Sequence, residues 1–398
     1  MMPIFPRNVW VLFVCQALTT CSAPVMIMVS GLLGLHLAPS ETLATLPQAF
    51  TVIGLASATI PAALLMRRIG RKRGTYVGLS LALAGALLGA GAATWGSFPL
   101  LVAAGFLLGT NLAFTQQYRF AVMESVPSRA DHGPAISLLL MGGIVAAWLG
   151  PEVGAQGRDL MASPHGYAGS FLLLACLIAV AMGVFALFRN PRVAMVEAQL
   201  PARPLAVVLR APVFIVAVGA GAISYAVMSF IMTATPISMH AMQGHSLEHT
   251  KFVIQSHIAA MYLPSLIGGW LLRRVGIARL LVVGALIYIA MLVLGLRGHA
   301  VLHYWWALVL LGVGWNFLFV GGTALLPSAY RTSERFKVQA ANDFLIFGAQ
   351  AVATLSAGGV LVLFGWEGLI LFSLAPVGIV TGLVLWYWRH GAVPMARA

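Results

Sequence analysis

Long apolar runs alternate with short polar segments along the whole of this 398-residue chain. A helix needs about 20 mostly apolar residues to cross the hydrocarbon core of a bilayer, and twelve runs approach or reach that length. They occupy residues 9–31, 43–66, 74–94, 97–118, 134–155, 168–188, 212–235, 251–272, 280–296, 301–325, 341–363 and 367–388. The pattern predicts an all-α integral membrane protein with twelve transmembrane helices.

The composition agrees with this prediction, because 60% of the residues are hydrophobic and only 8% are charged. A chain with so few polar residues cannot cover a soluble globular surface and must use lipid as its solvent. The formal charge of +13 lies in short basic clusters between the apolar runs, which argues against a nucleic-acid partner. If the N terminus is cytoplasmic, 20 of the 23 Lys and Arg residues are cytoplasmic and only Arg158, Lys251 and Arg297 face outward. This bias predicts a multi-pass protein with both termini in the cytoplasm.

Two sequence motifs recur at about half the length of the chain. Ala63 to Gly70 reads ALLMRRIG, and Gly269 to Gly276 reads GWLLRRVG, about 206 positions later. Gly109 to Phe114 (GTNLAF) is likewise repeated as Gly314 to Phe319 (GWNFLF). The repeat divides the chain into a six-helix bundle over residues 1–190, a linker over 191–210 and a second bundle over 211–398. This organisation resembles the parallel-repeat plan of the major facilitator superfamily.

The segment Leu64 to Gly74 resembles the superfamily's signature loop between helices 2 and 3, G-x-L-x-D-R-x-G-R-K. Its acidic position holds Arg67 here. Other charged residues are therefore the candidates for gating or for coupling to a proton. They are Arg68 and Arg71 in the loop, Arg119, and the carboxylates Glu124, Glu152 and Asp343.

Soft metal ligands gather around the seventh and eighth runs. Met228 and Met232 lie four residues apart in one run, and His257 and Met261 lie four apart in the next, so each pair shares a helix face. Thioether and imidazole are ligands typical of copper, above all Cu(I), and a histidine inside a membrane helix commonly marks a transport pathway. Because the two runs are joined by a short segment, we expect neighbouring helices with the four side chains at matching depths.

Further sulfur and imidazole groups are secondary metal candidates. Packing is the alternative for those within the membrane, because methionine and buried thiols often only fill apolar cores. Exposure to solvent is the alternative for those in the segment between the two runs. The candidates are Cys21 and Met26 in the first run, and Met239, His240, Met242, His245 and His249 in the segment that we expect to be an outer loop.

The M-x-x-x-M and H-x-x-x-M motifs in these two runs resemble those of the CcoA-like transporters (CalT family) of the major facilitator superfamily. The resemblance implies a copper importer of the bacterial inner membrane that works by alternating access and supplies copper for cytochrome oxidase assembly. It implies Met228, Met232, His257 and Met261 as metal ligands, copper as substrate rather than bound cofactor, and copper chaperones as partners. Other members of the wider family carry riboflavin and lack these motifs.

Two other functions remain open. One is a carrier of an organic solute, such as riboflavin or a drug-like amphiphile, with the methionines as an apolar lining and Trp148, Trp315 and Tyr225 stacking on the ligand. The other is a copper sensor that does not transport. An enzyme is not expected, because the sequence contains no nucleophile and base pair and no nucleotide-binding motif.

Overall fold

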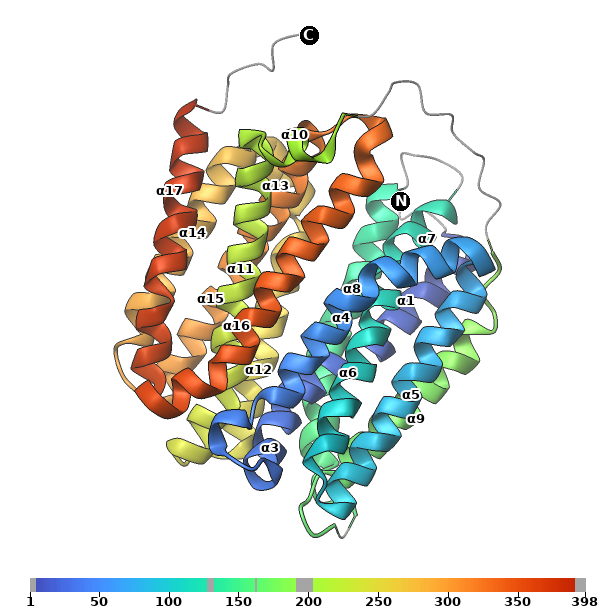
Figure 1. The fold of residues 1–398 in the computed structure, drawn as a ribbon, viewed down its shortest axis with the longest axis vertical. Coiled ribbons are helices and arrows are strands. Elements are labelled where there is room, and N and C mark those ends of the chain that lie inside the picture. Colours follow the sequence, from blue (N-terminus) through green and yellow to red (C-terminus); the bar gives the residue numbers. More distant parts are fainter. Residues whose placement is uncertain (1–4, 127–131, 162, 191–202, 391–398) are drawn as a thin grey trace.

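The computed structural model describes residues 5–126, 132–161, 163–190 and 203–390. Within these ranges the chain is a bundle of long helices with no strand (Figure 1). The first helix begins and the last helix ends at the same end of the bundle, which we call the terminal end; the opposite end is the distal end (Figure 1).

The N-terminal half begins with one nearly continuous helical span, Arg7–Leu37. It is interrupted after Thr20 because Pro24 has no N–H to donate to the carbonyl of that residue. The span comprises α1 (Arg7–Thr20), α2 (Ser22–Val25), a π-helical turn (Met26–Ser30) and α3 (Gly31–Leu37). The other helices of this half are α4 (Leu46–Ile69), α5 (Arg71–Trp95), α6 (Phe98–Thr115), α7 (Tyr118–Glu124), α8 (His132–Gln156) and α9 (Ala168–Phe185).

The C-terminal half repeats this arrangement. Its eighth span is broken by a 3₁₀ turn at Leu263–Leu266, where Pro264 interrupts the helical hydrogen bonding. The helices are α10 (Leu205–Leu209), α11 (Pro212–Pro236) with a π-helical extension (Ile237–Met242), α12 (Leu247–Tyr262), α13 (Gly268–Val275), α14 (Ile277–Gly295), α15 (Val301–Leu325), α16 (Arg335–Phe372) and α17 (Leu374–His390).

Length and composition alone identify ten candidate membrane spans among the described residues. The two missing spans have structural explanations. The eighth is divided into α12, of 16 residues, and the short α13. The last two are counted as one because α16 continues through Gly365, whose φ of 69° and ψ of −169° are not helical and mark the turn between them. The twelve-helix prediction is therefore confirmed.

The repeated glycines adopt the same backbone conformation. Gly70 has φ 84° and ψ 157°, and Gly276 has φ 82° and ψ 156°. Each separates two helices at the terminal end, and the left-handed φ explains why glycine recurs there. The half-length repeat is thus also structural.

Each half has its own buried core. One core contains only residues before 190, and the other is built mostly from residues after 205. Most of the predicted linker, residues 191–202, lies outside the described residues, so its boundaries remain a prediction. The halves meet mainly where α4 packs on α16 and α8 packs on α12.

Candidate functional site

An aromatic cluster lies where the two halves meet. The Tyr225 ring on α11 makes edge-to-face contacts with three rings of the C-terminal half, at centroid distances of 5.0 Å to Trp315, 5.1 Å to Phe319 and 5.7 Å to Phe347. Trp315 and Phe319, one turn apart on α15, are stacked at 5.1 Å. Phe347 belongs to a small apolar core shared between the halves, and Tyr225 and Phe319 pack against this core.

The N-terminal half contributes to this shared core from α4 and α6. The buried residues from these helices are Leu55, Ala62, Met66, Ala113 and Phe114. The aromatic rings therefore lie against a core to which both halves contribute.

Polar groups continue the aromatic cluster toward the distal end. Ser229 lies one turn beyond Tyr225 on α11, and Gln350 lies one turn beyond Phe347 on α16. The Gln350 Nε2 donates to Ser229 Oγ at 2.7 Å. The Gln350 Oε1 and the Trp315 Nε1 are buried without a hydrogen-bond partner among the described residues. Because an unpaired buried polar atom is costly, one donor and one acceptor are available here for a ligand.

Sequence reasoning identified only part of this cluster. Tyr225 and Trp315 were predicted as stacking residues, whereas Phe347, Gln350 and Ser229 were not. The four-residue spacing of Trp315 and Phe319 was the one available signal. The third predicted stacking residue, Trp148 on α8, is 54% exposed.

The four predicted metal ligands are buried in the apolar core of the C-terminal half and do not face lipid. Met228, Met232, His257 and Met261 are at most 8% exposed. The Met228 sulfur lies 3.8 Å from the Ser229 hydroxyl, which links it to the polar groups beside the aromatic cluster.

His257 is held in one tautomer. Its Nδ1 lies 2.7 Å from the carbonyl oxygen of Leu308 on α15, and because a carbonyl can only accept, Nδ1 carries the proton. In the neutral ring, Nε2 then holds a free lone pair, and this atom is buried without a partner among the described residues. Histidines that ligate metals are commonly oriented by such a bond on the other ring nitrogen.

The two ligand-bearing helices contact each other, as expected of neighbours, but only over a small area. α15 packs extensively on both α11 and α12, whereas those two contact each other only slightly. The π-helical extension carries α11 to Met242, and this extension also contacts α12 near the distal end. No group of three or more His, Cys, Asp or Glu side chains in the described part of the chain could hold a metal ion, a criterion that leaves methionine out. Convergence of the four ligands remains a prediction.

The expected outer loop is largely helical. Met239, His240 and Met242 lie on the π-helical extension, and His249 lies in the first turn of α12. Met239 is fully buried and Met242 is 49% exposed. The helix extends this far because the first residues of the segment, TATPIS, are themselves buried and continue the apolar surface of α11.

Two imidazoles of this segment make hydrogen bonds to main-chain carbonyls. His240 Nδ1 lies 2.7 Å from the His245 carbonyl oxygen, and His245 Nε2 lies 2.6 Å from that of His299. Each of these nitrogens therefore carries a proton and cannot ligate a metal while the bond persists.

The secondary candidates of the first span belong to a different core. Cys21 and Met26 are fully buried in the apolar core of the N-terminal half. The Cys21 thiol donates to the Ala17 carbonyl oxygen at 3.2 Å. Cys21 and Met26 are therefore in positions where a side chain packs the apolar core, which favours the packing alternative for both.

The charged candidates form two ion pairs near the terminal end. Glu124 pairs with Arg71 of the signature loop. Arg119 instead reaches Asp343 on α16 at 3.3 Å and joins the two halves. The sequence alone does not predict these two ion pairs, because the packing of the helices determines which carboxylate lies beside Arg71 and which lies beside Arg119. Arg68 is exposed.

A third ion pair joins the halves at the distal end. Glu152 on α8 lies 2.9 Å from Lys251 on α12, which also reaches Glu248 at 2.8 Å. Hydrogen bonding from Gln255 to the Trp148 carbonyl oxygen, at 3.1 Å, reinforces this contact. Ion pairs therefore link the halves at both ends of the bundle.

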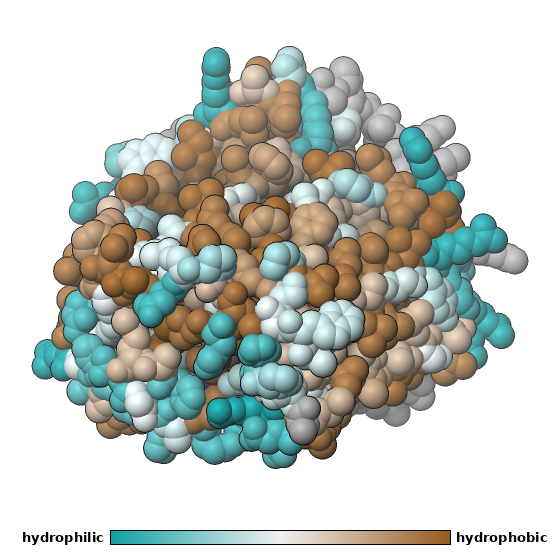
Figure 2. Space-filling model, turned by 60° about the horizontal axis from the view of Figure 1, so that its bottom comes forward, coloured by the Kyte–Doolittle hydropathy of each residue, from teal (hydrophilic) through white to brown (hydrophobic). Residues whose placement is uncertain are grey.

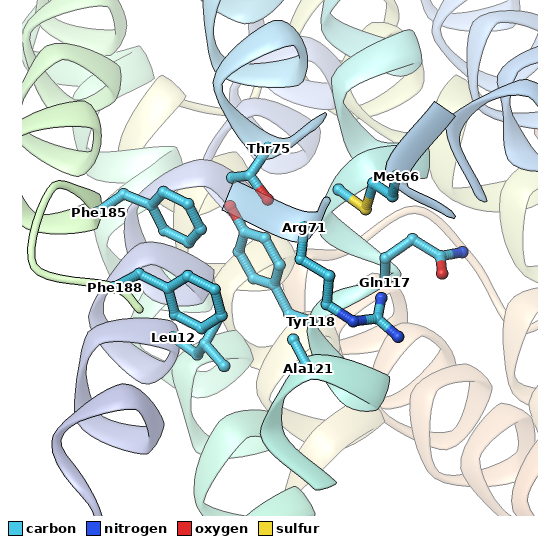
Figure 3. Close-up of a pocket in the computed structure, with 9 residues that line it drawn as sticks. All are labelled: Leu12, Met66, Arg71, Thr75, Gln117, Tyr118, Ala121, Phe185 and Phe188. Atoms are coloured by element: carbon cyan, nitrogen blue, oxygen red, sulfur yellow. The ribbon is translucent and has the colours of Figure 1, made fainter. Parts of the chain in front are cut away.

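A narrow crevice lies beside the Arg71 side chain in the N-terminal half. Figure 3 shows the Arg71 guanidinium extending past Tyr118 toward Gln117, with the Phe185 and Phe188 rings on the other side. The crevice is mostly apolar and leaves almost no volume for a water molecule. We therefore assign it to packing around the signature loop.

Comparisons with known proteins give relatives along nearly the whole chain. The model of the Major Facilitator Superfamily matches residues 11–354. The riboflavin transporter RfnT of Brucella anthropi is 38% identical over 91% of this chain and 90% of its own length. An uncharacterised transporter of the same superfamily from Bacillus subtilis, YddS, is 29% identical over 92% of this chain and 87% of its own length.

Solved structures show the same fold at low sequence identity. The transporter FucP in its outward conformation aligns with a TM-score of 0.63 and 16% identity, over 96% of this chain and 97% of its own. The human organic anion transporter MFSD10 aligns with a TM-score of 0.68 and 15% identity, over 96% of this chain and 100% of its own.

Proposed function

The chain belongs to the major facilitator superfamily, and we propose that, as a secondary transporter of this family, it carries riboflavin or a similar planar, hydrogen-bonding solute. It is a transporter rather than an enzyme, embedded in the lipid bilayer as a multi-pass protein. The relationship to a riboflavin transporter over 91% of the chain is the main support for this substrate class.

The observation that carries the proposal is the aromatic cluster between the halves. A flavin ring is flat, so it can stack on or meet the edges of aromatic side chains at centroid distances of about 4.5–7 Å. Its edge carries hydrogen-bond donors and acceptors. The unpaired Trp315 Nε1 and Gln350 Oε1 are a buried donor and acceptor in or next to the same cluster. The cluster thus offers both kinds of contact that such a solute requires.

Transport follows from alternating access of this cluster. The Arg119–Asp343 pair links the halves near the terminal end, and the Glu152–Lys251 pair links them at the distal end. Opening one pair while the other holds would expose the aromatic rings to one side of the membrane at a time.

Uptake of radiolabelled riboflavin into proteoliposomes tests the proposal. We expect Trp315→Leu to reduce uptake at least tenfold, because it removes both a stacking surface and a buried donor. Trp306→Leu is the matched control, since Trp306 lies on the same helix but is 45% exposed. Equal uptake by the parent, Trp315→Leu and Trp306→Leu would remove the aromatic cluster from the transport route.

Copper is the second candidate substrate, and His257 is the observation that favours it. A neutral imidazole with a buried, unpartnered Nε2 is the form in which histidine ligates a metal. Met228, Met232 and Met261 are buried in the same core, and neutral thioethers bind Cu(I) without losing a proton. In this case the chain would import copper across the bacterial inner membrane for cytochrome oxidase assembly and would exchange it with copper chaperones.

Copper uptake separates the two candidates. If Cu(I) is the substrate, Met232→Leu and His257→Ala should abolish accumulation of labelled copper while the variants still insert into the membrane. Copper accumulation in the double variant equal to that of the parent would exclude these ligands.

A further inference from the structure

The distal end contains a cavity of about 530 Å³ that both halves line. The N-terminal half contributes the end of its first span and the segment before α9, and the C-terminal half contributes His240 and Ala241 from the extension of α11. Figure 2 looks obliquely onto this end of the molecule, where hydrophilic side chains are interspersed with hydrophobic ones. The volume lies within the range of small-molecule sites, about 300–1,000 Å³.

Two imidazoles that line this cavity each keep one nitrogen as a possible hydrogen-bond acceptor. His36 Nδ1 lies 2.9 Å from the Leu32 carbonyl oxygen, as His240 Nδ1 lies 2.7 Å from that of His245. Each Nδ1 must therefore donate, and in the neutral ring each Nε2 keeps a free lone pair. Ser163 adds another acceptor, because its hydroxyl proton is used in a hydrogen bond of 2.9 Å to the Ala93 carbonyl oxygen.

Arg158 supplies the donors. Its guanidinium carbon lies 5.7 Å from the centre of the Tyr167 ring, a contact that orients it by cation–π attraction. The Asp159 carboxylate lies 3.9 Å from the guanidinium and is 90% exposed, so this ion pair is weak and leaves N–H groups of Arg158 available. Leu32, Leu35 and the buried Tyr167 give the cavity an apolar part.

This set of groups selects among ligand classes. With neutral imidazole rings, the acceptors of His36, His240 and Ser163 would meet an oxyanion with lone pairs, which disfavours phosphates and carboxylates. The described residues contain no group of three or more His, Cys, Asp or Glu side chains that could hold a metal ion, which disfavours a metal ligand of this kind. A hydroxyl group donates and accepts at once, so it can satisfy an imidazole Nε2 and a guanidinium N–H together.

We propose that the distal cavity binds a neutral polyhydroxylated solute, such as a sugar alcohol chain, between Arg158 of the N-terminal half and His240 of the C-terminal half. Because residues of both halves line the cavity, a bound solute would stabilise the conformation in which the two halves are closed at the distal end. The binding site is independent of whether the transported solute is a flavin.

Equilibrium binding of radiolabelled ribitol to the purified protein in lipid nanodiscs tests the proposal. We expect saturable binding by the parent, and weakening by about tenfold in Arg158→Met, which loses hydrogen bonds from a charged donor. His240→Phe, which loses an acceptor and leaves Arg158 in place, should weaken binding as well. Arg297→Met is the matched control, because Arg297 is an exposed arginine at the distal end that does not line the cavity.

The proposal is overturned if the parent shows no saturable ribitol binding, or if the folded His240→Phe variant binds ribitol as the parent does. Its failure is distinct from failure of the proposed function. Ribitol binding without riboflavin transport would leave the cavity assignment standing, and riboflavin transport with no ribitol binding would refute it. If the protein both binds ribitol and transports riboflavin, His240→Phe should raise the KM for riboflavin uptake from the distal side and leave kcat unchanged. This last expectation rests on the proposed function.

Discussion

Replacing His257 by leucine separates the contribution of this residue to stability from its contribution to transport. The substitution removes one hydrogen bond, to the Leu308 carbonyl oxygen at 2.7 Å. The net contribution of such a bond to stability is about 1 kcal/mol. It also removes a buried Nε2 without a partner among the described residues, and the penalty for such an atom is about 1–3 kcal/mol. Leucine refills most of the volume, so little cavity is created.

The two effects oppose each other, and the penalty is the larger. We therefore expect His257→Leu to change the free energy of unfolding by less than about 2 kcal/mol, toward greater stability. Thermal unfolding of the purified protein in detergent measures this change. Ile258→Ala, at a buried neighbour on the same helix, is the sensitivity control and should cost about 2–5 kcal/mol through the cavity that it leaves.

Transport by the same variant distinguishes the candidate substrates. Riboflavin uptake should be retained in His257→Leu, whereas Cu(I) uptake, if the parent shows it, should be lost without loss of stability. Destabilisation as large as that of Ile258→Ala would refute the reasoning, because it would mean that Nε2 has a stabilising partner.

Three further variants test other parts of the structure. Hydrogen bonding from Arg203 holds the pKa of the buried Glu334 well below its ordinary value of 4.5. Arg203→Gln should therefore lower the unfolding temperature by its full amount at pH 7. The difference should shrink as the pH falls from about 4.5 toward the lowered pKa of the parent, because the Glu334 carboxylate takes up a proton at a higher pH when Arg203 is absent. Gly109→Val should disrupt folding, measured as loss of monodisperse protein, because an added Cβ would lie 1.8 Å from the Thr51 carbonyl oxygen; a normally folded variant would contradict the close packing of α4 on α6. Lys251→Met should increase the labelling of a cysteine introduced at the distal interface beside the Glu152–Lys251 pair; unchanged labelling would show that this ion pair has no gating role.

The sequence predicted most of the fold because the relevant signals are local. Apolar runs of bilayer length located the helices, and the repeated arginine pair with its glycine located two equivalent turns, at Gly70 and Gly276. The break in the eighth span was missed, although Pro264 marks it. The extension of α11 to Met242 was also missed. Its polar residues resemble those of a loop, although most residues of the segment are buried.

The site was harder to predict because membrane helices are apolar on all sides. Their sequence does not reveal which face meets another helix and which meets lipid, so it could not show that Phe347 and Gln350 face Tyr225 and Ser229. Nor could it show that α15 packs against both ligand-bearing helices. Burial of His257 was predictable from its position within an apolar run, whereas its fixed tautomer depends on the Leu308 carbonyl oxygen of another helix.

Substrate flux into proteoliposomes tests the central claim most directly. Purified protein would be reconstituted, and uptake of labelled riboflavin and of labelled Cu(I) would be measured in parallel with Trp315→Leu and protein-free liposomes as controls. We predict saturable uptake of labelled riboflavin that unlabelled riboflavin inhibits and that Trp315→Leu reduces at least tenfold. Saturable Cu(I) uptake with no riboflavin uptake above protein-free liposomes would contradict it and assign the transport route to the methionine and histidine side chains.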